Sequence, residues 1–327
     1  MRPWTGEAAA LAKRIGKFVA GGPDDFEALA LTIHGYQVQR CKVRRGLTDT
    51  EPVKWTDIPA IPVSLFRDLE VGTVAGPIAF RTSGTSTGRR GVHRLRSTRL
   101  ADLGARAWAK SCLSTWPPTG VALLPSPTAA PDSSLSHLVS ILLPNVTWHL
   151  VDGRVDVDAI EHRLSVAHGP VFVATTAFAL ADWLDADPPR LPAGSLLMVT
   201  GGFKGRRRDL DQAQLLREAQ GVLGPQRIVR EYGMTELSSE AWADETGPYR
   251  LPPWLRVQAR DPWTGEPSLP GEPGQLGFTD LCNLDGSVAI ETMDVGTVPD
   301  PHTVVLHGRL TGAEPRGCSL RVEERHE

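Results

Sequence analysis

Short apolar runs alternate with segments of helical periodicity through the middle of the chain. The runs predict strands at 121–124, 148–151, 171–174, 196–199 and 228–230, and the segments between them predict helices at 133–143, 156–167, 176–185 and 208–220. Strands that alternate with helices indicate parallel sheets. Because the strands are apolar throughout, both faces of each sheet should be covered. We therefore expect an α/β fold with two doubly wound subdomains.

The regions on either side of this core have other patterns. Apolar residues at helical spacing predict two amphipathic helices within 5–45. The proline-rich segment 58–63 predicts an extended connector, because proline suits neither a helix interior nor a central strand. Short strand-like runs among prolines and glycines after 240 predict a small, distorted β-rich subdomain. The sequence thus divides into a helical region 1–75, an α/β core 76–240 and a β-rich subdomain with a tail 241–327.

Charge and cysteine usage exclude several classes of protein. The net charge of -3 gives no reason to expect a nucleic-acid or membrane partner. No apolar run reaches the roughly 18 residues that a membrane-spanning helix needs, and the first residues lack the apolar centre of a secretory signal. The four cysteines are spaced too irregularly for a zinc site or a disulfide framework. We expect a cytoplasmic protein with reduced thiols.

A loop rich in hydroxyl groups and glycine follows the short apolar run at 78–80. Its candidate ligand-binding residues are Thr82, Ser83, Gly84, Thr85, Ser86, Thr87, Gly88 and Arg90. Backbone amides and hydroxyl groups in a flexible loop suit a polyphosphate, and Arg89, Arg90 and His93 would add positive charge. The loop is not a Walker A motif, because no Gly-Lys-Ser/Thr follows at the required spacing. The alternative is an ordinary surface loop.

Three further segments carry residues that suit a nucleotide. The strand at 228–230 ends in Tyr232, Gly233, Met234, Thr235 and Glu236. A tyrosine can stack on a base, a threonine can reach a phosphate and a glutamate can hold Mg²⁺. Asp294 suits ribose hydroxyls and Arg309 suits a phosphate. Each segment alone would also fit an ordinary strand end.

In order and spacing these motifs resemble the adenylate-forming superfamily, which includes acyl-CoA synthetases, nonribosomal-peptide adenylation domains and firefly luciferase. The resemblance covers roughly 80–327. Within it, the segments 200–205, 278–283 and 306–320 look most like the acyl-protein synthetase of the bacterial bioluminescence fatty-acid reductase complex. This resemblance implies the large N-terminal domain of the adenylate-forming fold without the C-terminal domain, and a ligand in the cleft where the strands end.

The resemblance also implies roles for the motif residues, with ATP and Mg²⁺ as cofactors. The 82–90 loop would bind the β- and γ-phosphates, although it has one more residue between Gly84 and Gly88 than the usual loop. The other implied contacts are Gly201 and Gly202 with adenine, Tyr232 with the base, Thr235 with the α-phosphate, Glu236 with Mg²⁺, Asp294 with ribose, and Arg309 with ribose or phosphate.

Three more residues are catalytic candidates, each with a structural alternative. Lys204 would neutralise the α-phosphate in place of the lysine that the C-terminal domain supplies elsewhere, or it is a solvated surface lysine. Cys318 would accept the acyl group, as the synthetase branch implies, or it is a small buried residue. His137 would border the acyl pocket, or it is a structural histidine.

These observations lead to one functional hypothesis and two alternatives. The protein would activate a carboxylic acid with ATP to an acyl-adenylate and pass the acyl group to a protein thiol or another acceptor. Its partners would be the acid and an acyl-accepting protein or reductase. The alternatives are an acyl- or aryl-CoA ligase and a non-catalytic scaffold that binds a nucleotide.

Overall fold

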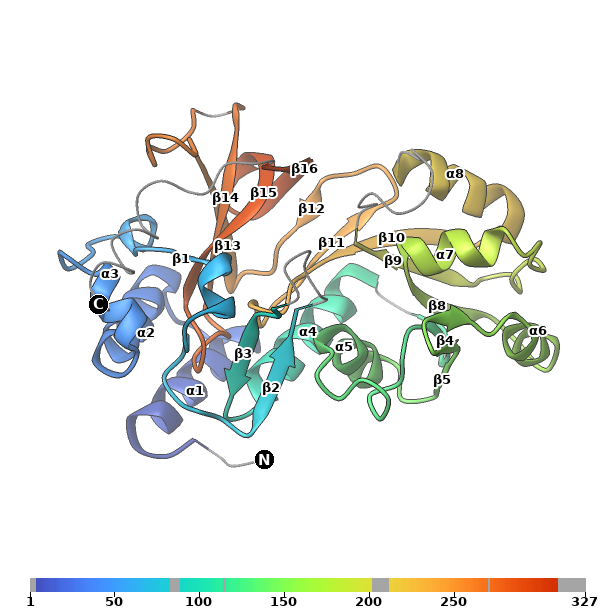
Figure 1. Ribbon diagram of the computed structural model, residues 1–327, viewed down its shortest axis with the longest axis horizontal. Helices are drawn as coiled ribbons and strands as arrows, with labels where there is room; N and C mark the ends of the chain where they lie inside the picture. The colour runs from blue at the N-terminus through green and yellow to red at the C-terminus, as the bar shows by residue number, and fades with distance from the viewer. Residues whose placement is uncertain (1–3, 83–88, 114–115, 202–211, 270, 311–327) are drawn as a thin grey trace. The chain divides into compact units, whose positions relative to one another are not determined.

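A computed structural model describes residues 4–82, 89–113, 116–201, 212–269 and 271–310 (Figure 1). The chain forms two compact units, each built from separate segments. Unit 1 comprises Met1–Ala107, Gly233–Glu240 and Arg250–Glu327, and unit 2 comprises Trp108–Tyr232 and Ala241–Tyr249. The three-part division of the sequence follows chain order and stays a prediction.

Unit 2 is built on a largely parallel sheet. Its strands are β4 (Thr119–Leu123), β5 (Val146–Trp148), β8 (Val171–Thr176), β9 (Leu196–Thr200), β10 (Arg227–Tyr232) and β11 (Ala241–Asp244). Their order is β11-β10-β9-β8-β4-β5. All pairs are parallel except β10 with β11, where the chain turns back. A two-residue hairpin pair, β6 (Leu150–Val151) and β7 (Arg154–Val155), follows β5.

Helices connect these strands, and three of them begin at a side-chain cap. The helices are α5 (Ser134–Leu142), α6 (Val157–Ser165), α7 (Ala177–Leu184) and α8 (Gln212–Leu223). Ser133, Asp156 and Thr176 each accept a hydrogen bond from the third amide of the helix that follows. Such caps satisfy amides that the helix itself leaves unpaired, so they fix where each helix starts.

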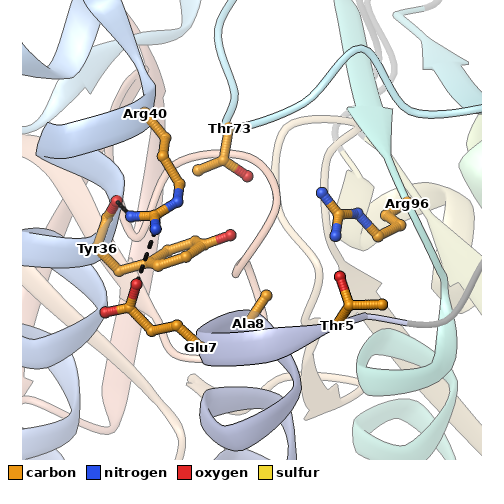
Figure 2. A pocket seen from close by; sticks show the side chains of 7 residues that line it. All are labelled: Thr5, Glu7, Ala8, Tyr36, Arg40, Thr73 and Arg96. Atoms are coloured by element: carbon orange, nitrogen blue, oxygen red, sulfur yellow. Dashed lines mark hydrogen bonds and ion pairs between the residues drawn. The ribbon is translucent and has the colours of Figure 1, made fainter.

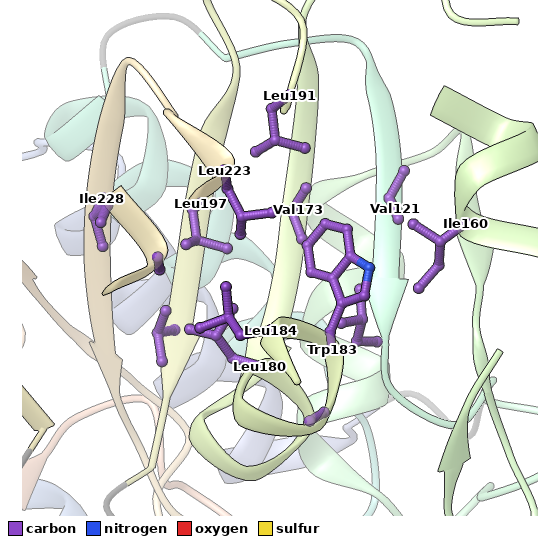
Figure 3. Packing of buried hydrophobic residues seen from close by; sticks show 14 of the residues in the cluster. Val121, Ile160, Val173, Leu180, Trp183, Leu184, Leu191, Leu197, Leu223 and Ile228 are labelled. Carbon is purple, nitrogen blue, oxygen red and sulfur yellow. The ribbon is translucent and has the colours of Figure 1, made fainter. Parts of the chain in front are cut away.

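The core of unit 2 lies between one face of the sheet and the helices α6, α7 and α8. Alternate strand residues such as Val121, Val173 and Leu197 point to this face and are fully buried. Trp183 of α7 packs among them with no exposed surface (Figure 3). Ala122 and Met198 point to the other face and are equally buried. The sheet is therefore covered on both sides, as its apolar strands predict.

Unit 1 combines N-terminal helices with an antiparallel sheet. Its elements include α1 (Gly6–Val19), α2 (Phe26–Arg40), α3 (Lys42–Leu47), the short helices Trp55–Asp57 and Val63–Arg67, the hairpin β2 (Ile78–Arg81) and β3 (Val92–Leu95), and the sheet β13 (Leu255–Arg260), β14 (Pro273–Asp280), β15 (Ala289–Asp300) and β16 (Thr303–Arg309). Helix α4 (Arg99–Leu113) and the short strand β12 (Tyr249–Arg250) span the boundary between the two units.

A buried arginine joins separate segments of unit 1. Arg44 of α3 has no exposed surface and donates hydrogen bonds to Pro59 O, Ser287 Oγ and Ala289 O. Burial lowers the pKa of this guanidinium to about 10. Because a buried charge is stable only when oxygen acceptors surround it, Arg44 fixes the proline-rich segment against the start of β15.

The structure confirms the α/β class, and the predicted strands and helices match the observed ones to within a few residues. The strand-like runs predicted after 240 belong to the antiparallel sheet β13–β16. The segment 58–63 contains extended backbone, as predicted, and its residues Ile61–Pro62 form a short strand, β1, that pairs in parallel with the start of β15. No helix in the described part of the chain is long and apolar enough to cross a bilayer.

The packing of unit 2 predicts that replacing two tryptophans, one buried and one exposed, changes the free energy of unfolding by very different amounts. Trp183→Ala should lower the free energy of unfolding by about 3–5 kcal/mol, because it leaves a cavity in a fully packed site. Trp263→Ala is the matched control. Because Trp263 is 71% exposed, its replacement should change the free energy of unfolding little. Urea unfolding followed by circular dichroism measures both, and equal losses would contradict the role of this core.

Candidate active site

The loop Gly233–Glu240 follows β10 and is held in unit 1 by one buried carboxyl group. Asp280, at the end of β14, has no exposed surface. It accepts hydrogen bonds from Ser238 N at 2.9 Å, Ser239 Oγ at 2.8 Å and Cys282 N at 2.9 Å. Burial raises the pKa of Asp280 to about 6, and these hydrogen bonds act in the opposite direction. The three donors offset much of the cost of burying this group.

A histidine and an asparagine hold the part of the loop that carries the predicted phosphate and metal contacts. His93 Nδ1 lies 2.7 Å from Thr235 O, and His93 Nε2 lies 3.0 Å from Asn283 Oδ1. Asn283 Nδ2 donates to Glu236 O at 2.7 Å. Since a carbonyl oxygen can only accept, Nδ1 carries a proton. The backbone of Thr235 and Glu236 is therefore fixed from two sides by fully buried side chains.

The carboxyl group of Glu236 is buried close to the base of the predicted phosphate loop. Its side chain is 6% exposed. A β-carbon at Gly91 would lie 3.5 Å from Glu236 Oε1, so this glycine leaves room beside the carboxyl group. Burial raises the pKa of Glu236 to about 7, the Arg309 guanidinium lowers it, and the Asp294 carboxylate raises it. A cation at this position would favour the ionised form.

The stem of the phosphate loop is the hydrogen-bonded pair Thr82 and Gly91 at the end of the β2–β3 hairpin. Thr82 N donates to Gly91 O at 3.0 Å, and Gly91 N donates to Thr82 Oγ1 at 2.9 Å. Arg90 donates to Thr82 O at 2.5 Å and to Arg81 O at 3.2 Å. Arg89 forms an ion pair with Asp68 at 2.9 Å. In the structure, Arg90 thus contributes to the stem of the loop.

Asp294 and Arg309 lie opposite one another on β15 and β16. Arg309 Nε donates to Asp294 Oδ1 at 2.6 Å, with 44% of the arginine side chain and 14% of the aspartate side chain exposed. An ion pair this open to water adds little stability. The pKa of Glu236 responds to both residues.

In unit 2, the ends of two neighbouring strands bring the adenine candidates together. Thr200 of β9 and Glu231 of β10 are in register, and Thr200 Oγ1 donates to Glu231 Oε2. Burial raises the pKa of Glu231 to about 7. Gly201 follows with φ +75°, a conformation that favours glycine. Tyr232 and Gly201 thus leave adjacent parallel strands at the edge where such sheets bind ligands.

Comparison with curated proteins gives two relatives, both named long-chain-fatty-acid–luciferin-component ligase. The protein from Aliivibrio fischeri is 26% identical over 309 residues, which cover 81% of this chain and 78% of the relative. The protein from Vibrio harveyi is 26% identical over 142 residues, which cover 39% of this chain and 37% of the relative. No family model matches the chain.

Comparison with solved structures extends the likeness to the fold. ATP-bound MatB from Rhodopseudomonas palustris matches with a TM-score of 0.53 at 16% identity, over 72% of this chain and 49% of MatB. The chain has the fold of the adenylate-forming enzymes. O-succinylbenzoate coenzyme A synthetase (MenE) from Bacillus subtilis, solved with ATP and magnesium, matches with a TM-score of 0.52 at 18% identity, over 71% of this chain and 49% of MenE. The chain thus spans about half the length of these two proteins, and the resemblance predicted from its motifs is confirmed.

The structure brings some of the predicted site residues together within each unit. Unit 1 gathers Thr82, Gly91, Glu236 and the Asp294–Arg309 pair, and unit 2 gathers Gly201 and Tyr232. The predicted positions Ser83, Gly84, Thr85, Ser86, Thr87, Gly88, Gly202, Lys204 and Cys318 lie outside the described residues. His137 lies half-buried on α5, and its role stays a prediction.

His93 corrects the sequence interpretation, which gave it a positive charge for the phosphate loop. It is fully buried, and this burial lowers its pKa, although its hydrogen bonds to Thr235 and Asn283 act in the opposite direction. It therefore acts as a hydrogen-bonding group that holds the Thr235–Glu236 backbone. Sequence reasoning also missed Asp280 and Asn283 as the residues that hold the loop, although both stand in the segment 278–283 that carries the family resemblance.

We predict that His93 fixes the loop through its hydrogen bonds. His93→Leu removes the donor to the buried Thr235 O, which should cost about 1–3 kcal/mol. His93→Asn should keep part of the contact, because its amide can donate from near the Nδ1 position. Hydrogen exchange of the Gly233–Glu240 amides measures the effect, and we expect it to be faster in His93→Leu than in His93→Asn.

His34→Leu provides a matched control for this experiment. His34 is also buried, at 3% exposed, but neither of its ring nitrogens has a hydrogen-bond partner among the residues that the structure describes. Replacing an unpaired buried polar group with an apolar one should change stability little or increase it. If loop exchange in His93→Leu stayed at the parent rate, the hydrogen bonds of His93 would not hold the loop.

Proposed function

We propose that the protein is a ligase that uses ATP and Mg²⁺ to convert a carboxylic acid to an acyl-adenylate. The observation that supports this is the cluster within unit 1, where the stem of a hydroxyl-rich loop lies beside a buried glutamate whose pKa responds to a partly exposed Asp–Arg pair. A phosphate-binding loop, a metal carboxylate and a pair of charged groups are the parts that such a reaction needs. The fold and the curated relatives support the same function.

The residues present suit a magnesium ion that is bound together with phosphates. In the part of the chain that the structure describes, no three His, Cys, Asp or Glu side chains form a metal-binding group. Mg²⁺ commonly binds one or two carboxylates and completes its shell with substrate phosphates and water. Glu236 would supply that carboxylate, and the 82–90 loop would hold the phosphates. The ion would neutralise charge on the phosphates as pyrophosphate leaves.

The proposed chemistry has two steps. In the first, a carboxylate oxygen of the acid bonds to the α-phosphorus of ATP, the bond to the pyrophosphate oxygen breaks, and pyrophosphate leaves. In the second, an acceptor atom bonds to the acyl carbon, the bond to the AMP oxygen breaks, and AMP leaves with the proton released from the acceptor. Thr235 would contact the α-phosphate, and its fixed backbone would hold that contact in place.

The relatives indicate which acid and which acceptor to test first. Both curated relatives are named for a long-chain fatty acid, so we infer a fatty acid as the first substrate to test. The solved MenE structure is that of a coenzyme A synthetase, which keeps coenzyme A as the second candidate acceptor beside a protein thiol.

The proposal predicts that Glu236 is needed for adenylation. Glu236→Gln removes the charge that would bind the metal and should reduce acid-dependent exchange between pyrophosphate and ATP by about a hundredfold or more. Glu272→Gln, which changes an exposed glutamate of the same unit, should exchange at the parent rate. Exchange at the parent rate in Glu236→Gln would contradict the metal assignment.

The raised pKa of Glu236 adds a dependence on pH. With a pKa of about 7, the free carboxyl is mostly protonated at pH 6 and mostly ionised at pH 8. A metal ion binds the ionised form, so Mg-ATP affinity should rise by about tenfold across this range. Calorimetry on the parent and on Glu236→Gln separates this rise from the titration of ATP itself, because the variant should lack it.

We also propose that Cys318 accepts the acyl group. The other three cysteines, Cys41, Cys112 and Cys282, are buried, and burial raises the pKa of Cys282 well above its usual value. A buried thiol is a poor nucleophile, because the thiolate is the reactive form. Cys318 lies outside the described residues, so the proposal rests on its position in the sequence.

The test is to incubate the protein with ATP, Mg²⁺ and a radiolabelled fatty acid and then denature it. Label that hydroxylamine removes, and that Cys318→Ser no longer acquires while pyrophosphate exchange continues, would support the thioester. Label that persists in this variant would assign the acyl group to another residue. Acyl-CoA formed when coenzyme A is added, with no label on the protein, would favour the second acceptor.

A further inference from the structure

A polar pocket of about 360 Å³ lies in unit 1, between the start of α1, helix α2 and the end of β3. Its lining residues are Thr5, Glu7, Ala8, Tyr36, Arg40, Thr73 and Arg96 (Figure 2). None of them belongs to the nucleotide motifs, so this inference does not rest on the proposed function. The pocket is large enough for a small organic molecule.

On one side of the pocket, the charged and aromatic side chains interact with one another. Arg40 forms an ion pair with Glu7 at 2.8 Å, and its guanidinium lies 4.2 Å from the centre of the Tyr36 ring. The charges of Arg40 and Glu7 cancel, and the Tyr36 ring is held against the Arg40 guanidinium. Tyr36 is only 4% exposed, and its hydroxyl group points into the pocket (Figure 2). That hydroxyl has no hydrogen-bond partner in the part of the chain that the structure describes.

The opposite side presents Arg96, whose guanidinium has no ion-pair partner among the described residues. Arg96 N donates to Asp285 Oδ2 at 2.8 Å, and Trp4 Nε1 donates to Asp285 Oδ1 at 2.9 Å, so this nearby carboxylate is already occupied. The Arg96 guanidinium makes no hydrogen bond or ion pair within the described ranges. It points towards the Tyr36 hydroxyl from across the pocket (Figure 2). Two donors therefore face the same space.

The charges and donors together select the ligand. Among the lining residues Arg40 and Glu7 cancel, so Arg96 supplies one uncancelled positive charge, which matches one carboxylate better than a phosphate dianion. The planar guanidinium fits a carboxylate with two parallel hydrogen bonds, and the Tyr36 and Thr5 hydroxyls can donate to it as well. The Thr5 side chain makes no capping bond to α1, so it is available.

Thr73 adds a hydrogen-bond acceptor to the pocket. Its hydroxyl donates to Asp285 O at 3.3 Å, so it faces a ligand as an acceptor. A ligand that fits the whole pocket therefore carries a carboxylate and a hydrogen-bond donor. We propose that this pocket binds a small hydroxycarboxylate, held by Arg96, Tyr36 and Thr5 at its carboxylate and by Thr73 at its hydroxyl.

The test uses sodium glycolate as the probe, without ATP and at constant ionic strength maintained with sodium chloride. Glycolate should raise the Tm in a saturable way, by about 2 °C at ten times its Kd for a chain of this length. Acetate, which lacks the hydroxyl, should need a higher concentration for the same shift. The absence of a saturable shift in the parent would overturn the proposal.

Variants locate the binding. Arg96→Gln should need at least about tenfold more glycolate to reach half of the maximal shift in Tm, because a charge-assisted pair is lost. Tyr36→Phe, which removes one hydroxyl, should need about threefold to tenfold more. Arg99→Gln is the matched control, since Arg99 is exposed, lies three residues away and does not line the pocket. A parent-like titration of Arg96→Gln would overturn the proposal, and so would inorganic phosphate binding more tightly than glycolate.

Discussion

The buried loop at 281–288, between β14 and β15, is the constraint on which much of unit 1 depends. Its polar groups lie away from water, and burying an unpaired polar group is costly, so each needs a partner from elsewhere in the chain. Gln37 of α2 donates to Asn283 O at 2.9 Å and accepts from Val288 N at 2.9 Å. Arg44, Trp4 and His93 reach the same stretch. The loop is thus fixed by segments from the whole N-terminal third of the chain.

Burial also gives the candidate site an unusual set of carboxyl groups. The pKa is raised to about 6 for Asp280 and to about 7 for Glu231 and Glu236, and desolvation is the largest cause in each case. A raised pKa means that the folded state holds protons that the unfolded state releases. The stability that these groups contribute is complete below about pH 4 and is lost as the pH rises through 6 to 7. Metal bound at Glu236 would offset part of this loss at neutral pH.

The sequence predicted the parts of the structure that depend on local patterns. The strands and helices of unit 2 follow from apolar runs and helical spacing, which are visible within a few neighbouring residues. The candidate ligand-binding residues follow from the order of the motifs along the chain. It did not predict the contacts that hold the motifs, because those contacts join distant positions. His93 and Asn283 are 190 residues apart, and Ser238 and Asp280 are 42 apart. Only the folded chain shows that His93 is buried between Thr235 O and the side-chain amide of Asn283.

The same loop connects the candidate site with the polar pocket of unit 1. Asp285 accepts from the Arg96 and Thr73 amides beside the pocket. Gly286 follows directly, and a side chain there would overlap His93 and Asn283, which hold the backbone of Thr235 and Glu236. Because close-packed interiors resist compression and transmit strain, this hydrogen-bonded loop links the backbone beside the pocket to the backbone that carries Glu236. The backbone that carries Glu236 is thus linked, through this loop, to residues near the N-terminus that no nucleotide motif contains.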